Sequence, residues 1–443
     1  MMGWQPVVLW SDAAFWLILG LTGMLIWRTR ASARDAWGRL FSMPAGAAAT
    51  VVLLAFLAVA MLDSMHFHAR LPGVPVRYDV TVRSVLDVIL QPLVAVPEKT
   101  YSAPLASRLF TRIQTTDAHG LPVREFAMLN IVRLHPARPD LPVRAALRSV
   151  LTGMMVFLAG WWLFGRTGKQ PVSALFAMLA ATAVLVSAVV FCVQVVGHLH
   201  VLGTDKVGQD VLYEALKSIR TDLLFGLLAT LLTLPLGVAF GMTSGYFGGW
   251  LDDLIQYVYT VMNSIPDILL IAAVVLLMQG YIETHAARFD TAAARADIRL
   301  LLLCLILGVT SWTGLCRVLR AETLKLRELD YVHAARAFGV SHARVLIRHI
   351  LPNLGHLILI TLVMDFSGLV LTEAVLTYLG LGVDASMASW GNMINAAELE
   401  LARDPVVWWP LAGAFCLMFA LVLSANIFAD SVQIAFDPLG RRA

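Results

Sequence analysis

The chain has few charged residues: Lys, Arg, Asp and Glu make up only 14% of its 443 residues, whereas 59% are hydrophobic. Soluble domains carry roughly 25% charged residues, so this composition excludes an ordinary soluble protein.

Cysteine is also scarce. The four cysteines lie in or at the ends of apolar runs without paired spacing, which predicts small core residues rather than disulfides or metal ligands; they are Cys192, Cys304, Cys316 and Cys416.

The chain lacks the phosphate-binding loop of a nucleotide hydrolase, a glycine-rich turn that ends in Gly-Lys-Ser or Gly-Lys-Thr before a helix. The nearest match starts at Gly165 and reads Gly-Arg-Thr-Gly-Lys-Gln, with the wrong spacing and with Pro171 directly after it. We interpret it as a basic turn between two membrane spans. We therefore expect no cofactor on this chain. If ATP hydrolysis drives its function, the ATPase that binds the ATP must be a separate subunit. No nucleic-acid partner is expected.

Two histidine pairs have a spacing that suits a metal ion bound on a strand. They are His66 with His68, and His198 with His200. Neither pair has a cysteine nearby or a carboxylate at ligand spacing. Both pairs follow the ends of apolar runs, where histidine is stable at the headgroup boundary. We therefore expect no metal site.

Nine apolar runs are long enough, or nearly long enough, to cross a bilayer. The third and the seventh have only 17 uncharged residues, so each is a tilted span, a re-entrant segment or a buried helix. The pattern predicts an all-α polytopic membrane protein. The runs cover residues 7–27, 40–62, 149–165, 172–196, 223–244, 254–279, 300–316, 354–377 and 406–429.

Basic residues near these runs predict the orientation, because Lys and Arg accumulate in short cytoplasmic loops. Four arginines follow the first run in residues 28–39, and seven Lys or Arg lie in residues 317–348. Alternating spans then place both segments in the cytoplasm, and the N-terminus and residues 63–148 outside. Residues 245–253 are cytoplasmic by the same alternation, although they carry no Lys or Arg. The first run is not expected to be a cleaved signal peptide, since no basic residue precedes it.

Four acidic residues interrupt three of the runs, and such side chains are expected to face the protein interior rather than lipid. They are Asp12, Asp267, Asp365 and Glu373. Asp365 and Glu373 are eight residues apart, which puts them about 12 Å apart along a helix and near a common face. They either line a polar translocation path or pair within the helix bundle. Asp267 is a third candidate for the path.

Two further groups are interpreted as structural rather than chemical. Asp205 and Asp210 could form a carboxylate pair for acid–base work, but Asp205 follows Gly-Thr in a turn pattern, and Asp210 is placed to cap the next helix. Trp408 and Trp409 precede a proline at the start of the last run. They are predicted to be an aromatic anchor at the membrane interface.

A charged, helix-prone segment over residues 333–353 lies between two apolar runs and reads HAARAFGVSHARVLIRHILPN. An Ala-Ala pair favours a helix, Gly339 breaks it, and Ser341 is placed to cap a second helix that ends near Pro352. Two short helices joined at a glycine make a compact projection, which suits a groove on a soluble partner.

This segment resembles the cytoplasmic coupling loop of ABC-importer permeases, in which a Glu-Ala-Ala triplet precedes a glycine and a downstream Leu-Pro. This chain has His333 where that pattern has Glu. The resemblance implies that residues 331–352 couple the chain to a separate ATPase. The residues implied in this contact are His333, Ala334, Ala335, Arg336, Gly339, Arg344, Arg348 and Pro352.

Residues 171–443 as a whole resemble the second permease of dipeptide, oligopeptide and nickel importers, because seven landmarks occur in the family's order. Gln209 replaces an arginine of the family pattern. The landmarks are Leu202-Gly203-Thr204-Asp205 with Gly208-Gln209-Asp210, Gly245–Trp250, Ser264-Ile265-Pro266, Arg348–Asn353, Tyr378–Gly382, Ser389–Met393 and Asp437-Pro438.

The resemblance implies a six-span permease domain over residues 171–443 that imports a peptide-like solute through the bacterial inner membrane. It also implies three kinds of partner: ABC ATPase subunits, a second permease chain, and an extracytoplasmic solute-binding protein. Three parts precede this domain. They are two extra spans over residues 1–62, an outside segment over residues 63–148, and a third extra span with a cytoplasmic turn over residues 149–170. The outside segment holds nine of the 18 prolines, which favours short strands and turns.

Two other classes of function compete with this interpretation of the sequence. A secondary transporter could be driven by protons through Asp267, Asp365 and Glu373, but that class usually shows paired repeats with broken helices, and the sequence shows no such self-similarity. A membrane-embedded hydrolase would need a nucleophile with its base, or a metal site, and no such constellation is present. Import coupled to a separate ATPase is the leading hypothesis, and the sequence does not name the solute.

Overall fold

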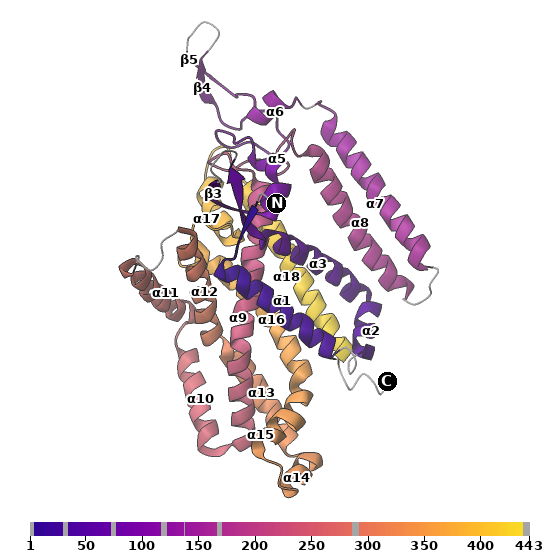
Figure 1. Cartoon of the computed structure of the whole chain (residues 1–443), viewed down its shortest axis with the longest axis vertical. Helices are drawn as coiled ribbons and strands as arrows, with labels where there is room; N and C mark the ends of the chain where they lie inside the picture. Colours follow the sequence, from indigo (N-terminus) through magenta and orange to yellow (C-terminus); the bar gives the residue numbers. More distant parts are fainter. Residues whose placement is uncertain are drawn as a thin grey trace. The chain divides into compact units, whose positions relative to one another are not determined.

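The computed structural model describes residues 4–29, 34–71, 77–116, 122–136, 138–165, 171–285 and 292–436. Most of the basic turn after Gly165 and the Asp437-Pro438 landmark lie outside these residues. Within the described residues, seven helices are long and apolar enough to cross a membrane, or eight if one bent pair is counted as a span. Figure 1 shows that helices dominate the chain. The prediction of an all-α polytopic membrane protein is confirmed.

The chain forms two compact units, each assembled from separate stretches. The first unit contains residues 1–12, 37–223 and 385–428, and the second contains residues 13–36, 224–384 and 429–443. Among the described residues, four helices are continuous through the boundaries, and each contributes residues to both units. They are α1 (Trp10–Thr29), α2 (Arg34–Ser42), α9 (Val211–Phe247) and α18 (Trp409–Phe436).

The first unit contains α3 (Pro44–Asp63), α7 (Leu141–Gly165) and α8 (Val172–Val195), and α8 packs against both α3 and α7. Glycines allow α7 to approach α8 closely. A Cβ atom on Gly153 would lie 2.0 Å from Ser187 Oγ, and one on Gly160 would lie 2.5 Å from Leu179 Cδ2. The contacts run in opposite directions along the two helices, so α7 and α8 are antiparallel. The short third apolar run is therefore part of a 25-residue helix that begins before it.

Residues 63–148 contain short strands and short helices. Strand β2 (His66–Leu71) pairs antiparallel with both β1 (Trp4–Val7) and β3 (Arg77–Ser84), and β4 (Ile113–Thr116) pairs with β5 (Pro122–Glu125). Helices α4 (Val85–Ile89), α5 (Gln91–Val94) and α6 (Asn130–Leu134) lie between and after these strands. A buried cluster joins them to the end of α8, and it includes Leu109, Leu129, Ile131, Val195 and Leu199. The strands expected from the proline spacing are present, and the segment has a packed core.

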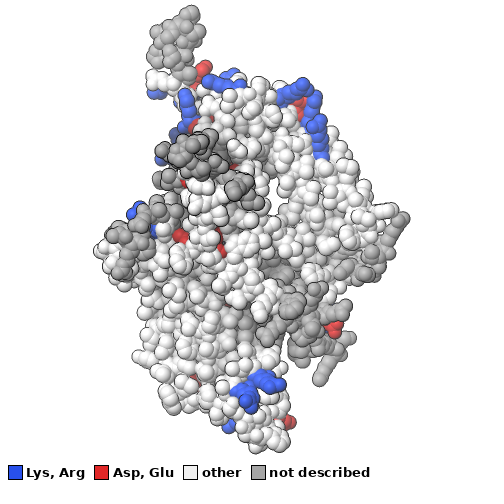
Figure 2. All heavy atoms as spheres, in the orientation of Figure 1, with Lys and Arg blue, Asp and Glu red and all other residues white. Residues whose placement is uncertain are grey.

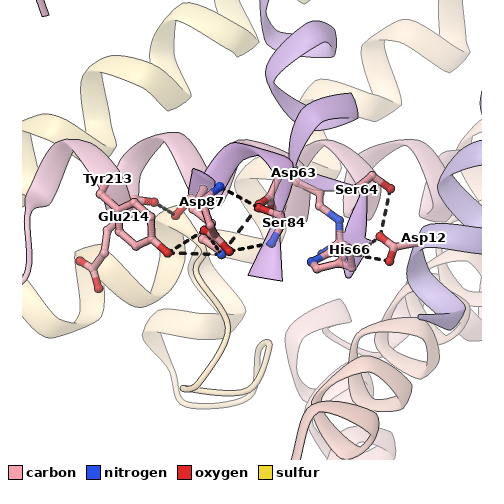
Figure 3. Close-up of polar contacts among 11 residues, drawn as sticks. Asp12, Asp63, Ser64, His66, Ser84, Asp87, Tyr213 and Glu214 are labelled. Atoms are coloured by element: carbon pink, nitrogen blue, oxygen red, sulfur yellow. Dashed lines mark hydrogen bonds and ion pairs between the residues drawn. The ribbon is translucent and has the colours of Figure 1, made fainter. Parts of the chain in front are cut away.

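The first turns of α9 are tied to the beginning of the chain by buried charges (Figure 3). Asp12 is only 2% exposed and forms an ion pair with Arg220. The carboxylate also accepts a hydrogen bond from Ser64 Oγ at 3.0 Å and lies 2.8 Å from His66 Nδ1. The prediction that Asp12 faces the protein interior is confirmed.

A second polar group lies one turn earlier on α9. Lys217 forms an ion pair with Asp87 and lies 3.9 Å from Asp63 Oδ1. Tyr213 Oη donates to the same Asp87 carboxylate at 2.8 Å, as Figure 3 shows. Ser84 completes the group by donating to Asp63 Oδ1 at 2.7 Å. Residues far apart in the sequence therefore neutralise one another around the start of α9.

The first unit also contains most of α2 and all of α17 (Trp390–Leu401). Trp390 is fully buried and fixes α17 to α9. Its backbone N–H donates to Asp222 Oδ2 at 3.0 Å, and its indole N–H donates to the carbonyl of Ala215 at 3.0 Å. Ser389 caps α17 by accepting a hydrogen bond from the N–H of Asn392. In the Ser-Trp-Gly-Asn landmark, the serine therefore caps α17 and the tryptophan packs α17 against α9.

The second unit contains α10 (Gly249–Ser264) and α11 (Asp267–Thr284), which bend by 86° at the break between them. The candidate span predicted over residues 254–279 is therefore a bent pair of helices, either a broken span or a re-entrant loop, rather than one continuous helix. Pro266 lies in the break, and it lacks the N–H that would continue the helix. The remaining helices are α12 (Ala292–Thr310), α13 (Trp312–Arg327), α14 (Asp330–Ala337), α15 (His342–Val345) and α16 (Leu351–Tyr378). The short seventh run lies in the apolar stretch that α12 and α13 form together.

Replacing Arg220 with Met is expected to destabilise the protein by about 3–5 kcal/mol, because it leaves the Asp12 carboxylate buried without its countercharge. Adding Asp12→Asn should restore most of the lost stability, since no unpaired charge then remains. Thermal unfolding of the detergent-solubilised chain measures both effects. Arg83→Met is the matched control, because Arg83 pairs with Asp79 on the surface with its side chain 53% exposed. Equal losses for Arg220→Met and Arg83→Met would contradict a structural role for the buried pair.

Candidate functional site

The segment with the coupling-loop resemblance is a helix, a glycine turn and a second helix. Gly339 has a φ of 76° directly after α14. Its N–H donates to the carbonyl of Arg336, and the N–H of Val340 donates to the carbonyl of Ala335. These two bonds form a Schellman motif, which ends a helix on a residue with positive φ. A glycine is needed here because L residues rarely adopt this conformation.

One face of this segment is buried against the ends of the neighbouring helices. Val332, Val345 and Ile350 are fully buried in a cluster with Leu315 and Leu319 of α13. Met242 and Tyr246 of α9 belong to the same cluster. Tyr246 Oη lies 2.8 Å from His342 Nδ1, which adds a polar contact between α9 and α15. The segment is therefore held firmly and cannot move without its supporting helices.

The opposite face is exposed and basic. All the predicted coupling residues except the buried Ala335 are exposed: His333, Ala334, Arg336, Gly339, Arg344, Arg348 and Pro352. Figure 2 shows basic side chains gathered at the end of the molecule where α14 lies in Figure 1. Phe338 is 87% exposed on the same segment and was not singled out from the sequence. The feature of the sequence that could have indicated Phe338 is a large apolar side chain directly before a glycine that the turn requires.

The second helix differs from its prediction. It does not end near Pro352, because α15 continues through a π-helical turn over Leu346–Ile350 directly into α16. Pro352 lies in the first turn of α16, where a proline is tolerated since its missing N–H would have no helical partner. Ser341 does occupy the position before α15, but its side chain makes no capping hydrogen bond. The segment is therefore continuous with a membrane-spanning helix.

Residues 245–253, which carry no Lys or Arg, are in direct contact with arginines of α13. Arg320 Nε and Nη2 donate to the two carboxylate oxygens of Asp252 at 2.6 and 2.7 Å. Arg327 Nη1 donates to the carbonyl of Gly245 at 3.2 Å. Because these contacts are direct, both segments lie on the same side of the membrane, as the alternation of spans requires.

The three candidate path residues lie in different surroundings. Asp267 is exposed in the first turn of α11, at the break between α10 and α11. Asp365 is half-buried on α16. Glu373, two turns further along α16, is only 1% exposed and accepts a hydrogen bond from Thr377 Oγ1 at 2.8 Å. Thr377 lies one turn further along the same helix, so this bond does not distinguish a path role from pairing within the bundle, and the path role of all three residues stays a prediction.

The loop before α9 is a tight turn that packs on the segment around residue 100. Asp205 accepts hydrogen bonds from the N–H groups of Val207 and Gln209, and Asp210 accepts one from Tyr213 at the start of α9. The prediction of a turn and a helix cap is confirmed. A Cβ atom on Gly208 would lie 1.9 Å from the carbonyl oxygen of Glu98, so only glycine fits there.

Thr204 joins this loop to two other segments. Its Oγ1 donates to the carbonyl of Thr100 at 2.9 Å and accepts from the N–H of Ser102 at 2.7 Å. The indole N–H of Trp409 donates to the carbonyl of Thr204 at 2.9 Å. Trp409 is 2% exposed and Trp408 is 55% exposed, so the predicted aromatic anchor describes Trp408 only. Trp409 is a buried docking residue.

His200 lies in the same loop, and its imidazole ring lies between two acidic side chains. Its Nδ1 lies 2.7 Å from Asp210 Oδ2, and its Nε2 lies 3.7 Å from Glu98 Oε1. Burial of the imidazole alone would lower its pKa, but the hydrogen bonds and charges of Asp210 and Glu98 outweigh burial and raise the pKa of His200 to about 9. Within the described residues, no group of His, Cys, Asp and Glu has the geometry of a metal site.

These features define a polytopic membrane protein with a rigidly supported basic projection between two spans. Comparison with known proteins agrees with this class. Residues 237–441 match the family described as binding-protein-dependent transport system inner membrane component. The oligopeptide transport system permease protein OppC of Bacillus subtilis is 30% identical over 244 residues, which are 55% of this chain and 73% of that protein.

Two further relatives have similar coverage. The dipeptide transport system permease protein DppC of Bacillus subtilis is 28% identical over 243 residues, 55% of this chain and 70% of that protein. The glutathione transport system permease protein GsiD of Pectobacterium atrosepticum is 30% identical over 240 residues, 54% of this chain and 72% of that protein.

The chain belongs to the family of inner membrane components of binding-protein-dependent transport systems. It is a multi-pass inner membrane protein and a permease of an ABC importer, and members of this family are transport subunits rather than enzymes. The comparisons give no support to the proton-coupled secondary transporter considered from the sequence.

The environment of His200 predicts a pH dependence of stability. A histidine whose pKa is raised from 6.5 to about 9 on folding contributes stability that is fully present below about pH 6.5 and is lost as the pH rises through 9. Thermal unfolding of the wild type should therefore weaken between pH 6.5 and pH 9, and His200→Gln should remove this part of the dependence. The exposed His135→Gln is the control. Parallel curves for His200→Gln and wild type would count against the ion pairs.

Proposed function

We propose that this chain is the permease subunit of an ATP-driven importer that carries peptide-like solutes inward through the inner membrane. The three relatives described above are named as transporting oligopeptides, dipeptides and glutathione, and this common chemistry supports a peptide-like solute. ATP binds to partner ATPase subunits, and this chain itself holds no cofactor. A second permease chain completes the pathway, and an extracytoplasmic solute-binding protein delivers the solute.

The observation that carries this proposal is the supported projection over residues 331–352. Its exposed face offers Arg336, Arg344 and Arg348 as charge contacts and Phe338 as an apolar contact. Short paired helices of this kind fill a groove on a partner, where an aromatic side chain and arginines are favoured contacts. The ATPase is the partner expected to provide the groove.

Coupling follows from how the projection is mounted. α13 leads into it and α16 leads out of it without a flexible linker, since the π-helical turn is continuous with α16. When the partner ATPases close on ATP, the projection moves with them and tilts α13 and α16, which switches access from outside to inside. The energy for this change is the difference in partner binding between the two states.

The polar residues at membrane depth give a candidate path for the solute. Asp365 is half-buried on α16, the helix that the projection moves directly. Asp267 lies at the bend between α10 and α11, where an interrupted helix leaves backbone groups free to face a solute. Carboxylates in such positions favour a cationic group such as a peptide amino terminus.

The proposal predicts that Gly339→Pro abolishes transport while the protein still inserts into the membrane. Proline requires a φ near −65° and has no N–H, whereas Gly339 has a φ of 76° and donates to Arg336. Solute uptake, with protein level and membrane fraction measured alongside, tests this. Gly355→Ala is the matched control, because a Cβ atom on that helical glycine would meet only open space and alanine favours a helix.

Uptake at the wild-type level by a well-expressed Gly339→Pro variant would reject the coupling role of the projection.

Gly339→Ala gives an intermediate test. Its Cβ meets nothing within 4 Å, so only the backbone strain of a positive φ acts, at a cost of about 1–2 kcal/mol. Reduced but measurable uptake is expected for this variant.

The predicted orientation is tested by cysteine labelling, because Lys99 and Ser341 are both exposed and lie on opposite sides of the membrane by the alternation of spans. In a Cys416→Ser background, which removes the exposed native cysteine, a Lys99→Cys variant should react with an impermeant thiol reagent in intact spheroplasts. A Ser341→Cys variant should react only after lysis. The reverse pattern would overturn the orientation and, with it, the assignment of residues 331–352 to the ATPase side.

A further inference from the structure

A basic pocket lies at the start of α7 in the first unit. Its volume is about 300 Å³. Arg144 and Arg148 lie four residues apart on α7 and therefore share one face of the helix. Arg138 lines the same pocket from the loop before α7, and Gln194 and His198 line it from the end of α8.

The pocket carries a net positive charge. Three arginines face one acidic side chain, Asp140, which pairs with Arg144 on the helix surface. Arg148 is exposed, and the described residues provide no carboxylate partner for it or for Arg138. In Figure 2, basic side chains gather beside an acidic one near the start of α7, which Figure 1 shows in the same orientation. The pocket is therefore suited to an anion.

The surface directly below the pocket is lipid-facing. Arg148 is the last charged residue before the apolar run over residues 149–165. On the same helix Met155 is 62% exposed and Leu158 is 57% exposed, and on α8 Val193 is 71% exposed. Large apolar side chains exposed on membrane-spanning helices contact acyl chains. The arginines thus lie at the depth where a lipid headgroup meets the hydrocarbon.

We propose that this pocket binds the headgroup of an anionic phospholipid, with Arg144 and Arg148 contacting the phosphate and the acyl chains lying along α7 and α8. Guanidinium groups bind phosphate oxygens through paired hydrogen bonds. Gln194 and His198 provide further polar groups at the rim. The bound lipid would hold together the antiparallel α7 and α8 pair, which lies outside the region matched by the transport family.

The test uses the full-length chain purified in detergent and titrated with phosphatidylglycerol or phosphatidylcholine, with bound lipid counted by native mass spectrometry. We expect phosphatidylglycerol to bind more tightly than phosphatidylcholine. Arg144→Gln combined with Arg148→Gln should lower the apparent affinity for phosphatidylglycerol about thirtyfold, since each basic side chain near an anionic headgroup contributes about a factor of five. Arg144→Lys with Arg148→Lys should keep most of the affinity, because the charges remain.

The matched control replaces two exposed arginines outside the pocket, Arg124→Gln with Arg133→Gln, and should bind lipid as the wild type does. Thermal unfolding without added lipid should be similar for all variants, because the replaced side chains are exposed. Equal affinity for the two lipids, or equal loss in the control and the pocket variant, would overturn the proposal. So would inorganic phosphate that displaces the lipid at millimolar concentration, which would identify a free anion as the ligand.

Discussion

The buried ion pair between Arg220 and Asp12 is the interaction on which the joining of the first unit depends. A charge without a partner is costly in a protein interior, and the bilayer around such an interior offers no water that could replace the missing partner. Arg220 and Lys217 on the first turns of α9 therefore require acidic partners, and Asp12 and Asp87 provide them from the part of the chain before residue 90. The start of α1 and the segment before residue 90 are thus bound to the first turns of α9.

α9 connects these contacts with the coupling segment in one continuous helix. Its first turns carry Lys217 and Arg220, and its last turns place Met242 and Tyr246 in the cluster that supports the coupling projection. Polar contacts dominate at its start, and apolar packing dominates at its end. The polar contacts fix which segments meet, whereas close apolar packing makes the projection rigid. The proposed coupling to an ATPase requires this rigidity, because a flexible mount would not transmit the movement of the ATPase to the spans.

The sequence predicted the membrane class, most of the spans and the helix–glycine–helix form of the coupling segment. These features depend on local properties, namely apolar runs, basic loops and a glycine with a required backbone conformation at position 339. It did not predict the bend between α10 and α11 or the continuation of α15 through Pro352, because a proline is compatible with both a break and the first turn of a helix. Nor did it single out Phe338, since exposure is a property of the folded chain.

The amino-acid sequence by itself determined that this protein spans a membrane several times, and it predicts the side on which each charged loop lies, because hydrophobicity and charge act residue by residue against the bilayer. Only the tertiary structure decided which charges neutralise one another. Asp12 meets Arg220 across 208 residues, and Lys217 meets Asp87 across 130 residues. The basic pocket at the start of α7 likewise exists only because α8 returns beside it. Contacts over such separations depend on how whole helices pack, and no local pattern in the sequence encodes them.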